Sequence, residues 1–287
     1  MDSLVLGIDA AWTAANPSGI ALVAVATGHT PKLLRVARTC GEFTSDRILG
    51  ASDWLSTSPS GGPLKIDHLF GTIKKNTGAL PNVIVLDIPL SPLPICGRRS
   101  ADNAISIKYG KQWAGTHTPS KERPGLVSAA LYRQFTGAGY NWVGVSKPEH
   151  LSENIRCFIE TYPHPVIVDM LGLEKRLCYK VTKSYKYWPS LTSEERWTNI
   201  ASELDRLRGA LASRIHGLAD RIPEALVLLD AVSKGRGTVF KGLEDALDAV
   251  VCAFTGCEFL AGRADAFGDQ NSAIWVPRRI QSMWPAE

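Results

Sequence analysis

The chain has 287 residues, of which 45% are hydrophobic and 21% are charged, so it has enough apolar residues for a sizeable globular core. Its formal net charge is only +4, which by itself indicates no nucleic-acid partner. The sequence has no run of roughly 18 apolar residues, no CxxC pair and no signal-peptide pattern. We therefore expect a cytoplasmic protein with reduced thiols and no membrane contact.

The first part of the chain predicts an antiparallel meander. Three apolar runs joined by short turns are typical of strands: 4–12, 20–26 and 33–39. Two later segments, separated by the loop 56–63, have helical spacing: 46–55 and 66–75. Asp9 lies near the end of the first apolar run, where a carboxylate is costly unless its charge is compensated.

The middle of the chain contains two further predicted strands that end in acids. The run 83–88 has no polar alternation before Asp87, which indicates a central strand covered on both faces. The segment 89–124 is rich in Pro and Gly, which is typical of a functional loop or an insertion. A helix at 126–135 follows, and then a strand at 155–160 that ends in Glu160. We interpret Tyr162-Pro163-His164-Pro165 as a breaker after that strand.

The last part of the chain predicts mainly helices. They are expected at 193–216, opened by Thr192 or Ser193, and at 222–232 and 240–260, before a short strand at 273–276. This order predicts an α/β fold, with a mixed sheet and helices on both of its faces. We expect one domain over 1–287, with insertions at approximately 89–124 and 175–232.

Acids on separate elements suggest a divalent-cation site. Asp9 and Asp87 stand at the carboxyl ends of strands, where α/β sheets commonly bind ligands. On the helix 240–260, Asp248 lies at the border of the apolar face, and Asp245 lies one turn earlier, well round towards the opposite side. Neighbouring carboxylates repel unless one takes a proton or a cation binds. Mg²⁺ or Mn²⁺ with hard oxygen ligands would compensate them and could activate water against a phosphodiester.

Each acid also has a structural interpretation. Asp9 and Asp87 would then cap the turns that follow them. Glu244, Asp245 and Asp248 would only favour the positive N-terminus of their helix. Glu160 is either a fourth ligand or a strand-end glutamate paired with a cation, for which the candidates are Arg98, Arg99 and Lys180.

A basic and aromatic stretch suggests a nucleic-acid ligand. Residues 175–188 hold five cations and no acid, with Tyr and Trp interleaved. Such cations would neutralise phosphate while the aromatic rings stack on unpaired bases, although a solvated loop with rings at the core edge is the alternative. Lys180 could approach the scissile phosphate. Arg98 and Arg99 could bind phosphate in a bidentate manner or be ordinary surface charges. His164 is a candidate proton shuttle or a structural histidine.

Taken together, these motifs resemble the ribonuclease H-like superfamily, and within it a microbial family of predicted ribonuclease H-like nucleases. The matching pieces are Gly7–Trp12 with Gly19–Ala21, Val85–Leu90, Arg98-Arg99 with Asp102, Glu160–Pro165, Tyr179-Lys180 and Glu244–Ala249. The resemblance implies a mixed five-stranded sheet, with three antiparallel strands and then parallel strands, flanked by helices. The segment 89–124 and the helices between 193 and 232 exceed the minimal fold.

The resemblance also implies a function and a set of site residues. The Asp245/Asp248 pair is similar to the aspartates of Holliday-junction resolvases in this superfamily. The expected protein is a nuclease that uses Mg²⁺ or Mn²⁺ to hydrolyse phosphodiester bonds of DNA or RNA. Its catalytic residues would be Asp9, Asp87, Glu160, Lys180 and Asp248. Its metal ligands would be Asp9, Asp87, Asp245 and Asp248, and its substrate contacts would be Arg98, Arg99, Asp102, Tyr179 and Lys183.

Two other classes of function remain open on the sequence. One is a non-catalytic module that binds nucleic acid or protein on the same fold, with the acids serving structure. The other is a phosphoryl-transfer enzyme acting on a nucleotide or another small phosphate. The sequence has no GxxxxGK[ST], no GxGxxG after a strand and no GxSxG, which argues against P-loop, nicotinamide and α/β-hydrolase enzymes of the usual types. The oligomeric state is not predicted.

Overall fold

The computed structural model describes residues 2–13, 15–56, 61–146, 156–232 and 234–279. Their central feature is a mixed sheet of eight strands. The strands are β1 (Ser3–Asp9), β2 (Gly19–Val25), β3 (Lys32–Ala37), β4 (Val83–Leu86), β5 (Asn141–Trp142), β6 (Cys157–Glu160), β7 (Ala264–Gly268) and β8 (Ala273–Pro277). Part of the predicted loop 56–63 and residue 155 of the predicted strand 155–160 lie outside the described residues.

The sheet has a meander on one side and parallel strands in its centre. Its order is β3-β2-β1-β4-β6-β8-β7, and β5 pairs with β6 off this path. The pairs β1–β2 and β2–β3 are antiparallel, as predicted, whereas β1, β4, β6 and β8 run parallel to one another, and β7 pairs antiparallel with β8. Because β1 and β4 are adjacent and parallel, their carboxyl ends, and hence Asp9 and Asp87, lie at the same edge of the sheet.

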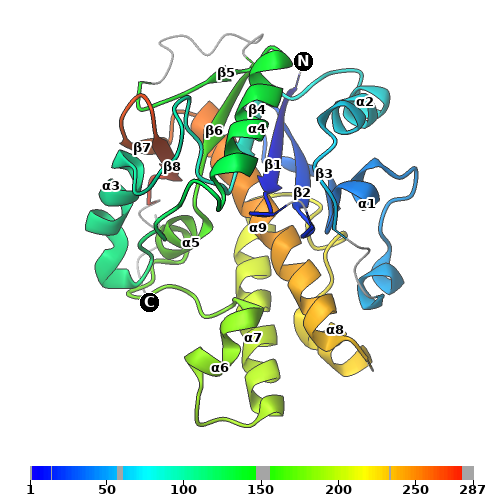
Figure 1. Ribbon diagram of the computed structural model, residues 1–287. Helices are drawn as coiled ribbons and strands as arrows, with labels where there is room; N and C mark the ends of the chain where they lie inside the picture. The colour runs from blue at the N-terminus through cyan, green and yellow to red at the C-terminus, as the bar shows by residue number, and fades with distance from the viewer. Residues whose placement is uncertain (1, 14, 57–60, 147–155, 233, 280–287) are drawn as a thin grey trace.

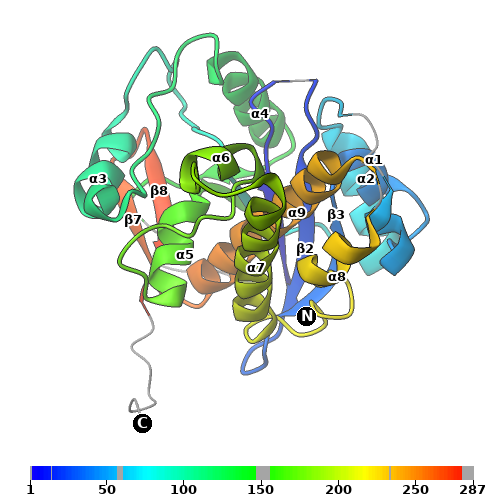
Figure 2. The same ribbon diagram turned by 90° about the horizontal axis from the view of Figure 1, so that it is seen from below.

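Helices cover both faces of the sheet (Figures 1 and 2). They are α1 (Cys40–Thr44), α2 (Ile66–Thr77), α3 (Ser100–Tyr109), α4 (Gly125–Gly137), α5 (Pro163–Leu171), α6 (Ser184–Tyr187), α7 (Ser193–Ala212), α8 (Ala225–Ala231) and α9 (Arg236–Leu260). Short 3₁₀ turns are η1 (Ala51–Leu55), η2 (Gly110–Gln112) and η3 (Val181–Lys183). No helix among these described segments is long and apolar enough to cross a membrane.

Two hydrophobic cores lie on opposite faces of the sheet. Side chains alternate between the faces of a strand, so Val5 and Val85 join the core of α5, α7 and α9, whereas Leu6 and Leu86 join the core of α2 and α4. The same alternation puts Phe158 of β6 in the second core. The face that each strand-end acid occupies follows from this register.

The long helix α9 lies directly against β1 and β2, and glycines make this approach possible. A Cβ atom added at Gly7 would meet the backbone of Ala249 and Ala253. One added at Gly19 would meet the carbonyl oxygen of Asp245. Residues Val239–Phe259 of α9 are almost all buried, which is the pattern of a helix enclosed on every side.

Several predicted elements differ from the structure. The predicted α-helix 46–55 is wrong, because α1 ends at Thr44 and only the 3₁₀ turn η1 falls within this range. The segment 89–124 contains α3 and is therefore not one loop. The predicted breaker at 162–165 is wrong, because Pro163 occupies the first turn of α5, where proline loses no helical hydrogen bond. The five-stranded sheet that the resemblance implied is extended by β8, which corresponds to the predicted strand 273–276, and by β5 and β7, which were not predicted.

Candidate functional site

Four predicted acids from three elements meet at the carboxyl ends of β1 and β4. Asp9 ends β1, Asp87 follows β4 directly, and Asp245 and Asp248 lie on α9, which crosses this face of the sheet. Asp9 lies close enough to Asp245 for the charge of Asp245 to raise the pKa of Asp9. Asp87 experiences the charges of both Asp9 and Asp248. The sequence therefore identified residues that the fold brings together.

Asp248 is completely buried and has two side-chain partners. Its Oδ1 atom accepts a hydrogen bond from the hydroxyl of Tyr179 at 2.7 Å. Its Oδ2 atom accepts one from the ammonium of Lys180. These contacts attach η3 and the residues before it to α9, so Tyr179 and Lys180 are part of the acid site.

Two residues of this site were not predicted as members. Lys241 donates to Asp245 and, at 2.9 Å, to Oε1 of Glu244. Oε2 of Glu244 accepts a hydrogen bond from the backbone nitrogen of Val181 at 2.7 Å. The spacings 241/244 and 241/245 place a lysine beside both acids on one helix surface, and this signal is visible in the sequence.

The helix itself corrects two expectations about its acids. Because α9 begins at Arg236, Glu244, Asp245 and Asp248 lie beyond its first turn, where the positive N-terminus has little effect. Asp245 was expected to lie round towards the opposite side from the core. It is 4% exposed, because β2 packs on that side of the helix through Gly19.

The site carries more negative than positive charge. We call Asp9, Asp87, Glu244, Asp245 and Asp248 the acid cluster, and only two cations, Lys180 and Lys241, neutralise it. Burial and the charge of Asp245 raise the pKa of Asp9 to about 7. Burial and the charges of Asp9 and Asp248 raise the pKa of Asp87 well above its usual value. Burial raises the pKa of Asp248 to about 6 against the opposing effect of Lys180. Three negative charges would thus remain if all five acids were ionised.

The oxygen ligands are of the type that Mg²⁺ and Mn²⁺ prefer, but they do not converge on one point. Among the residues that the structure describes, no three His, Cys, Asp or Glu side chains are arranged to hold a metal ion. The lysine ammonium groups bridge the α9 carboxylates instead, Lys180 lying 3.3 Å from Oε1 of Glu244. The donor chemistry fits a divalent cation, and binding would require the two lysines to move away from the acids.

Asp87 differs from the other members of the acid cluster in having no partner. It is partly exposed, and its carboxylate forms no hydrogen bond or ion pair with the described part of the chain. It lines a small pocket together with Trp12, His117 and Tyr162. A ligand that reaches this pocket therefore meets a carboxylate that is not neutralised.

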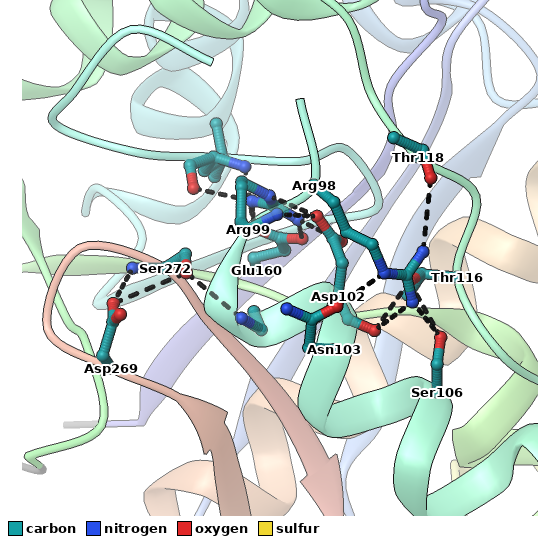
Figure 3. A network of polar contacts seen from close by, with 12 residues as sticks. Arg98, Arg99, Asp102, Asn103, Ser106, Thr116, Thr118, Glu160, Asp269 and Ser272 are labelled. Atoms are coloured by element: carbon teal, nitrogen blue, oxygen red, sulfur yellow. Dashed lines mark hydrogen bonds and ion pairs between the residues drawn. The ribbon is translucent and has the colours of Figure 1, made fainter. Parts of the chain in front are cut away.

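Glu160 is not a member of the acid cluster but the centre of a second network (Figure 3). Its carboxylate receives two hydrogen bonds from Arg99, at 2.6 and 2.7 Å, and one from the backbone nitrogen of Leu90 at 2.7 Å. Arg99 also bonds both carboxylate oxygens of Asp102 and the carbonyl oxygen of Leu90. We call Leu90, Arg99, Asp102 and Glu160 the Arg99 network.

Strand alternation explains this separation. Asp9 and Asp87 are in phase with Val5 and Val85, whose side chains face α9. Glu160 is in phase with Phe158, which faces the opposite core. Of the two interpretations of Glu160, the ion pair with Arg99 is the one the structure contains. The sequence signal that separates Glu160 from the aspartates is its position in the alternation of side chains along its strand.

The residues predicted to contact substrate differ in their burial and in their partners within the protein. Arg99 and Asp102 belong to the Arg99 network, and Arg98 donates to Asn103, Ser106 and Thr118, so in this structure all three make contacts within the protein. Tyr179 is fully buried and offers no free ring face for stacking on a base. Lys183, at the end of η3, is half-buried and forms no ion pair with the described residues.

Comparison with known proteins identifies one family. The model of a family described as "Protein of unknown function (DUF429)" matches residues 7–273, which include the acid cluster and the Arg99 network. Searches of curated proteins and of solved structures gave no match.

Proposed function

The chain belongs to this family of unknown function, DUF429, and we propose that it is a divalent-metal-dependent phosphodiesterase that hydrolyses nucleic acid. The path β3-β2-β1-β4-β6, with its antiparallel meander and parallel centre, supports a ribonuclease H-like core for this activity. The acids of β1, β4 and α9 lie at one edge of that path, where ligands bind in α/β sheets.

The observation that carries the proposal is the carboxyl group of Asp87, which has no hydrogen-bond or ion-pair partner among the described residues. It lies in a cluster that holds more acids than lysines. Buried acids usually have hydrogen-bonded or charged partners, as Glu160 does. At Asp87, burial and the charges of Asp9 and Asp248 instead raise the pKa in spite of Lys180, which costs folding free energy. An arrangement that costs stability is typical of a functional site.

The proposed ligands of the cation are Asp9, Asp87, Asp245 and Asp248. A bound Mg²⁺ or Mn²⁺ would supply charge neutralisation and a coordinated water of lowered pKa. In the metal-free protein, burial and the charge of Asp245 raise the pKa of Asp9 to about 7, and a bound cation would favour the ionised, ligating form of this carboxyl group. Lys180 is 19% exposed and is flexible enough to leave Asp248 for a phosphate oxygen of the substrate.

The first test is metal-dependent stability. We expect Mn²⁺ to stabilise the wild-type protein by about 2.7 kcal/mol at a hundredfold excess over Kd, measured by thermal unfolding against EDTA. The substitution Asp87→Asn should remove this shift. Asp46→Asn is the matched control, because Asp46 is an exposed acid paired with Lys75 on the surface and should leave the shift intact.

The second test is cleavage. Single- and double-stranded DNA and RNA oligonucleotides should be cut in the presence of Mn²⁺ by the wild type and by Asp46→Asn, but not by Asp9→Asn or Asp248→Asn. Cleavage that persists in both of these variants would show that the acid cluster is not catalytic. If Mn²⁺ has no effect on stability either with or without an oligonucleotide, the metal-dependent proposal fails.

One observation favours a second candidate, a binding module without catalysis. Lys180 and Lys241 already bridge the α9 acids, so part of the cluster is an ion-pair network without any metal. In a binding module, oligonucleotide affinity would be unaffected by Mn²⁺ and unchanged in Asp87→Asn. The same measurements therefore separate the two functions.

A further inference from the structure

A group of cations lies beside the acid cluster and is not part of it. Arg176 precedes η3, and its backbone nitrogen donates to the carbonyl oxygen of Gln112 at 2.7 Å. This contact holds the basic stretch against the segment that leads to His117. The stretch then continues through η3 to Lys183, and η3 packs on α9. Figure 2 shows α6, which follows η3, next to α5 and α7.

The cations of this group have no carboxylate partners. Nε of Arg176 is buried without a hydrogen-bond partner among the described residues, and the guanidinium lies 5.7 Å from the ring centre of Tyr187. Lys183 also forms no ion pair with any described residue. The charge of Glu244 acts on Lys183, but Glu244 is already held by Lys180 and Lys241.

The cations lie near enough to one another for each to act on the charge of the next. Burial, Arg176 and Lys180 lower the pKa of Lys183. Partial burial, Lys183 and Arg176 lower the pKa of His117. His164 of α5 lies close to the same charges, and its Nδ1 atom is buried without a partner among the described residues. The region thus holds hydrogen-bond donors and positive charge that the described chain leaves unused.

The position of His117 connects this group to the proposed active site. His117 and Asp87 line the same small pocket. An anion bound at the cations would therefore lie next to the carboxylates proposed to hold the metal.

We propose that His117, Arg176 and Lys183 form a binding site for a phosphomonoester group, the terminal phosphate of a nucleic-acid strand or of a small ester. The inference rests on the proposed function for its substrate class. The two cations Arg176 and Lys183 match the charge of a terminal phosphate, which is about −1.5 to −2, better than the single charge of an internal phosphodiester. A strand end held here presents its first linkage to the acid cluster, so cleavage proceeds from an end of the strand.

The first experiment measures the binding of inorganic phosphate to the metal-free protein. The readouts are titration calorimetry and the imidazole NMR signals of His117. We expect Arg176→Gln and Lys183→Gln each to weaken binding about tenfold, which is the loss of one charge-assisted hydrogen bond. Lys175→Gln is the matched control, because its ammonium lies 4.5 Å from the ring centre of the exposed Trp113, and it should bind like wild type.

The second experiment compares oligonucleotides in EDTA that differ only in the end group, a 5′-phosphate, a 3′-phosphate or hydroxyls at both ends. We expect one phosphorylated end to bind about tenfold more tightly than the hydroxyl ends, and the difference to disappear in Arg176→Gln and Lys183→Gln. A small phosphate ester in place of the strand reports whether the phosphate group alone is sufficient.

The outcomes distinguish this site from the proposed nuclease activity. Equal affinity for phosphorylated and unphosphorylated ends, or inorganic phosphate binding that is unchanged in both folded variants, would overturn the phosphate site even if Mn²⁺-dependent cleavage is found. End-dependent binding without any metal-dependent cleavage would support the phosphate site and count against the nuclease. Circular dichroism of each variant establishes folding, and Lys183→Gln is a second variant should Arg176→Gln fail to fold.

Discussion

The acid cluster and the Arg99 network both bury carboxylates near the ends of neighbouring parallel strands, yet their chemistry is opposite. In the Arg99 network, one guanidinium bonds two carboxylates, and a backbone nitrogen adds a further bond. In the acid cluster, five carboxylates share two lysines, and Asp87 has no partner in the described chain. The comparison teaches that burial of an acid does not by itself indicate function, whereas incomplete neutralisation does.

The largest effect on stability is expected from a substitution that removes the central cation of the Arg99 network. Arg99→Ala leaves Glu160 and Asp102 buried without their cation, and we expect a loss of about 3–5 kcal/mol of unfolding free energy. Urea denaturation of the metal-free protein measures it. A loss below about 1 kcal/mol would mean that the network contributes little to the fold and that Arg99 is available for substrate.

The second prediction is that two matched substitutions change the unfolding free energy in opposite directions. At pH 8, Asp9→Asn should raise the unfolding free energy of the metal-free protein by about 1–3 kcal/mol, because it removes a charge repelled by Asp245 and Asp87. Glu160→Gln should lower it by a similar amount, because Arg99 loses its charged partner. Destabilisation by both substitutions would show that the two regions do not differ in this way.

The third prediction concerns pH. The pKa values of Asp9 and Asp248, about 7 and about 6, lie above those of the unfolded chain, and burial also raises the pKa of Glu160 to about 7 in spite of Arg99, so the native protein keeps protons that the unfolded chain has released. Unfolding free energy should therefore fall as pH rises from about 4 to about 7, by at most about 1.4 kcal/mol per pH unit for each proton. Mn²⁺ or Asp9→Asn should flatten this slope, measured by denaturation at fixed ionic strength. A rise in stability over this window would contradict the pKa directions.

The smallest effect is expected at Arg98, in the segment just before α3. Arg98 neighbours Arg99, but its partners are neutral oxygens of Asn103, Thr118 and the Asp102 backbone. Arg98→Ala should cost about 1 kcal/mol, the net value of an ordinary hydrogen bond, and should leave the pH slope unchanged. A cost equal to that of Arg99→Ala would mean that neutral and charged partners are equivalent here.

The sequence predicted the central strands because uninterrupted apolar runs and short turns are local signals. It also located Asp9, Asp87 and Asp248, since a carboxylate at the end of a core strand or on a buried helix is conspicuous. It left open whether Glu160 is a further ligand or an ion-pair partner, because the face of the sheet that a strand-end acid occupies depends on how its strand packs in the fold. It missed α5, because a proline indicates the end of an element unless it occupies the first turn of a helix, as Pro163 does. The enclosure of Asp245 depends on the packing of α9 on Gly19, which is a tertiary contact without a local signature.

The packing of α9 on β1 also has a consequence for how the protein is made. The thiol of Cys252 in α9 contacts the carbonyl oxygen of Ile8 in β1, two residues that are 244 positions apart in the chain. At ribosomal rates of about 5–20 residues per second, β1 waits on the order of tens of seconds for the helix that covers it. During that time the apolar face of β1 that carries Val5 and Gly7 is not covered by α9, and we expect chaperones to bind the nascent chain there. Prematurely terminated chains cannot assemble the acid cluster, so the proposed nuclease remains inactive until its synthesis is nearly complete.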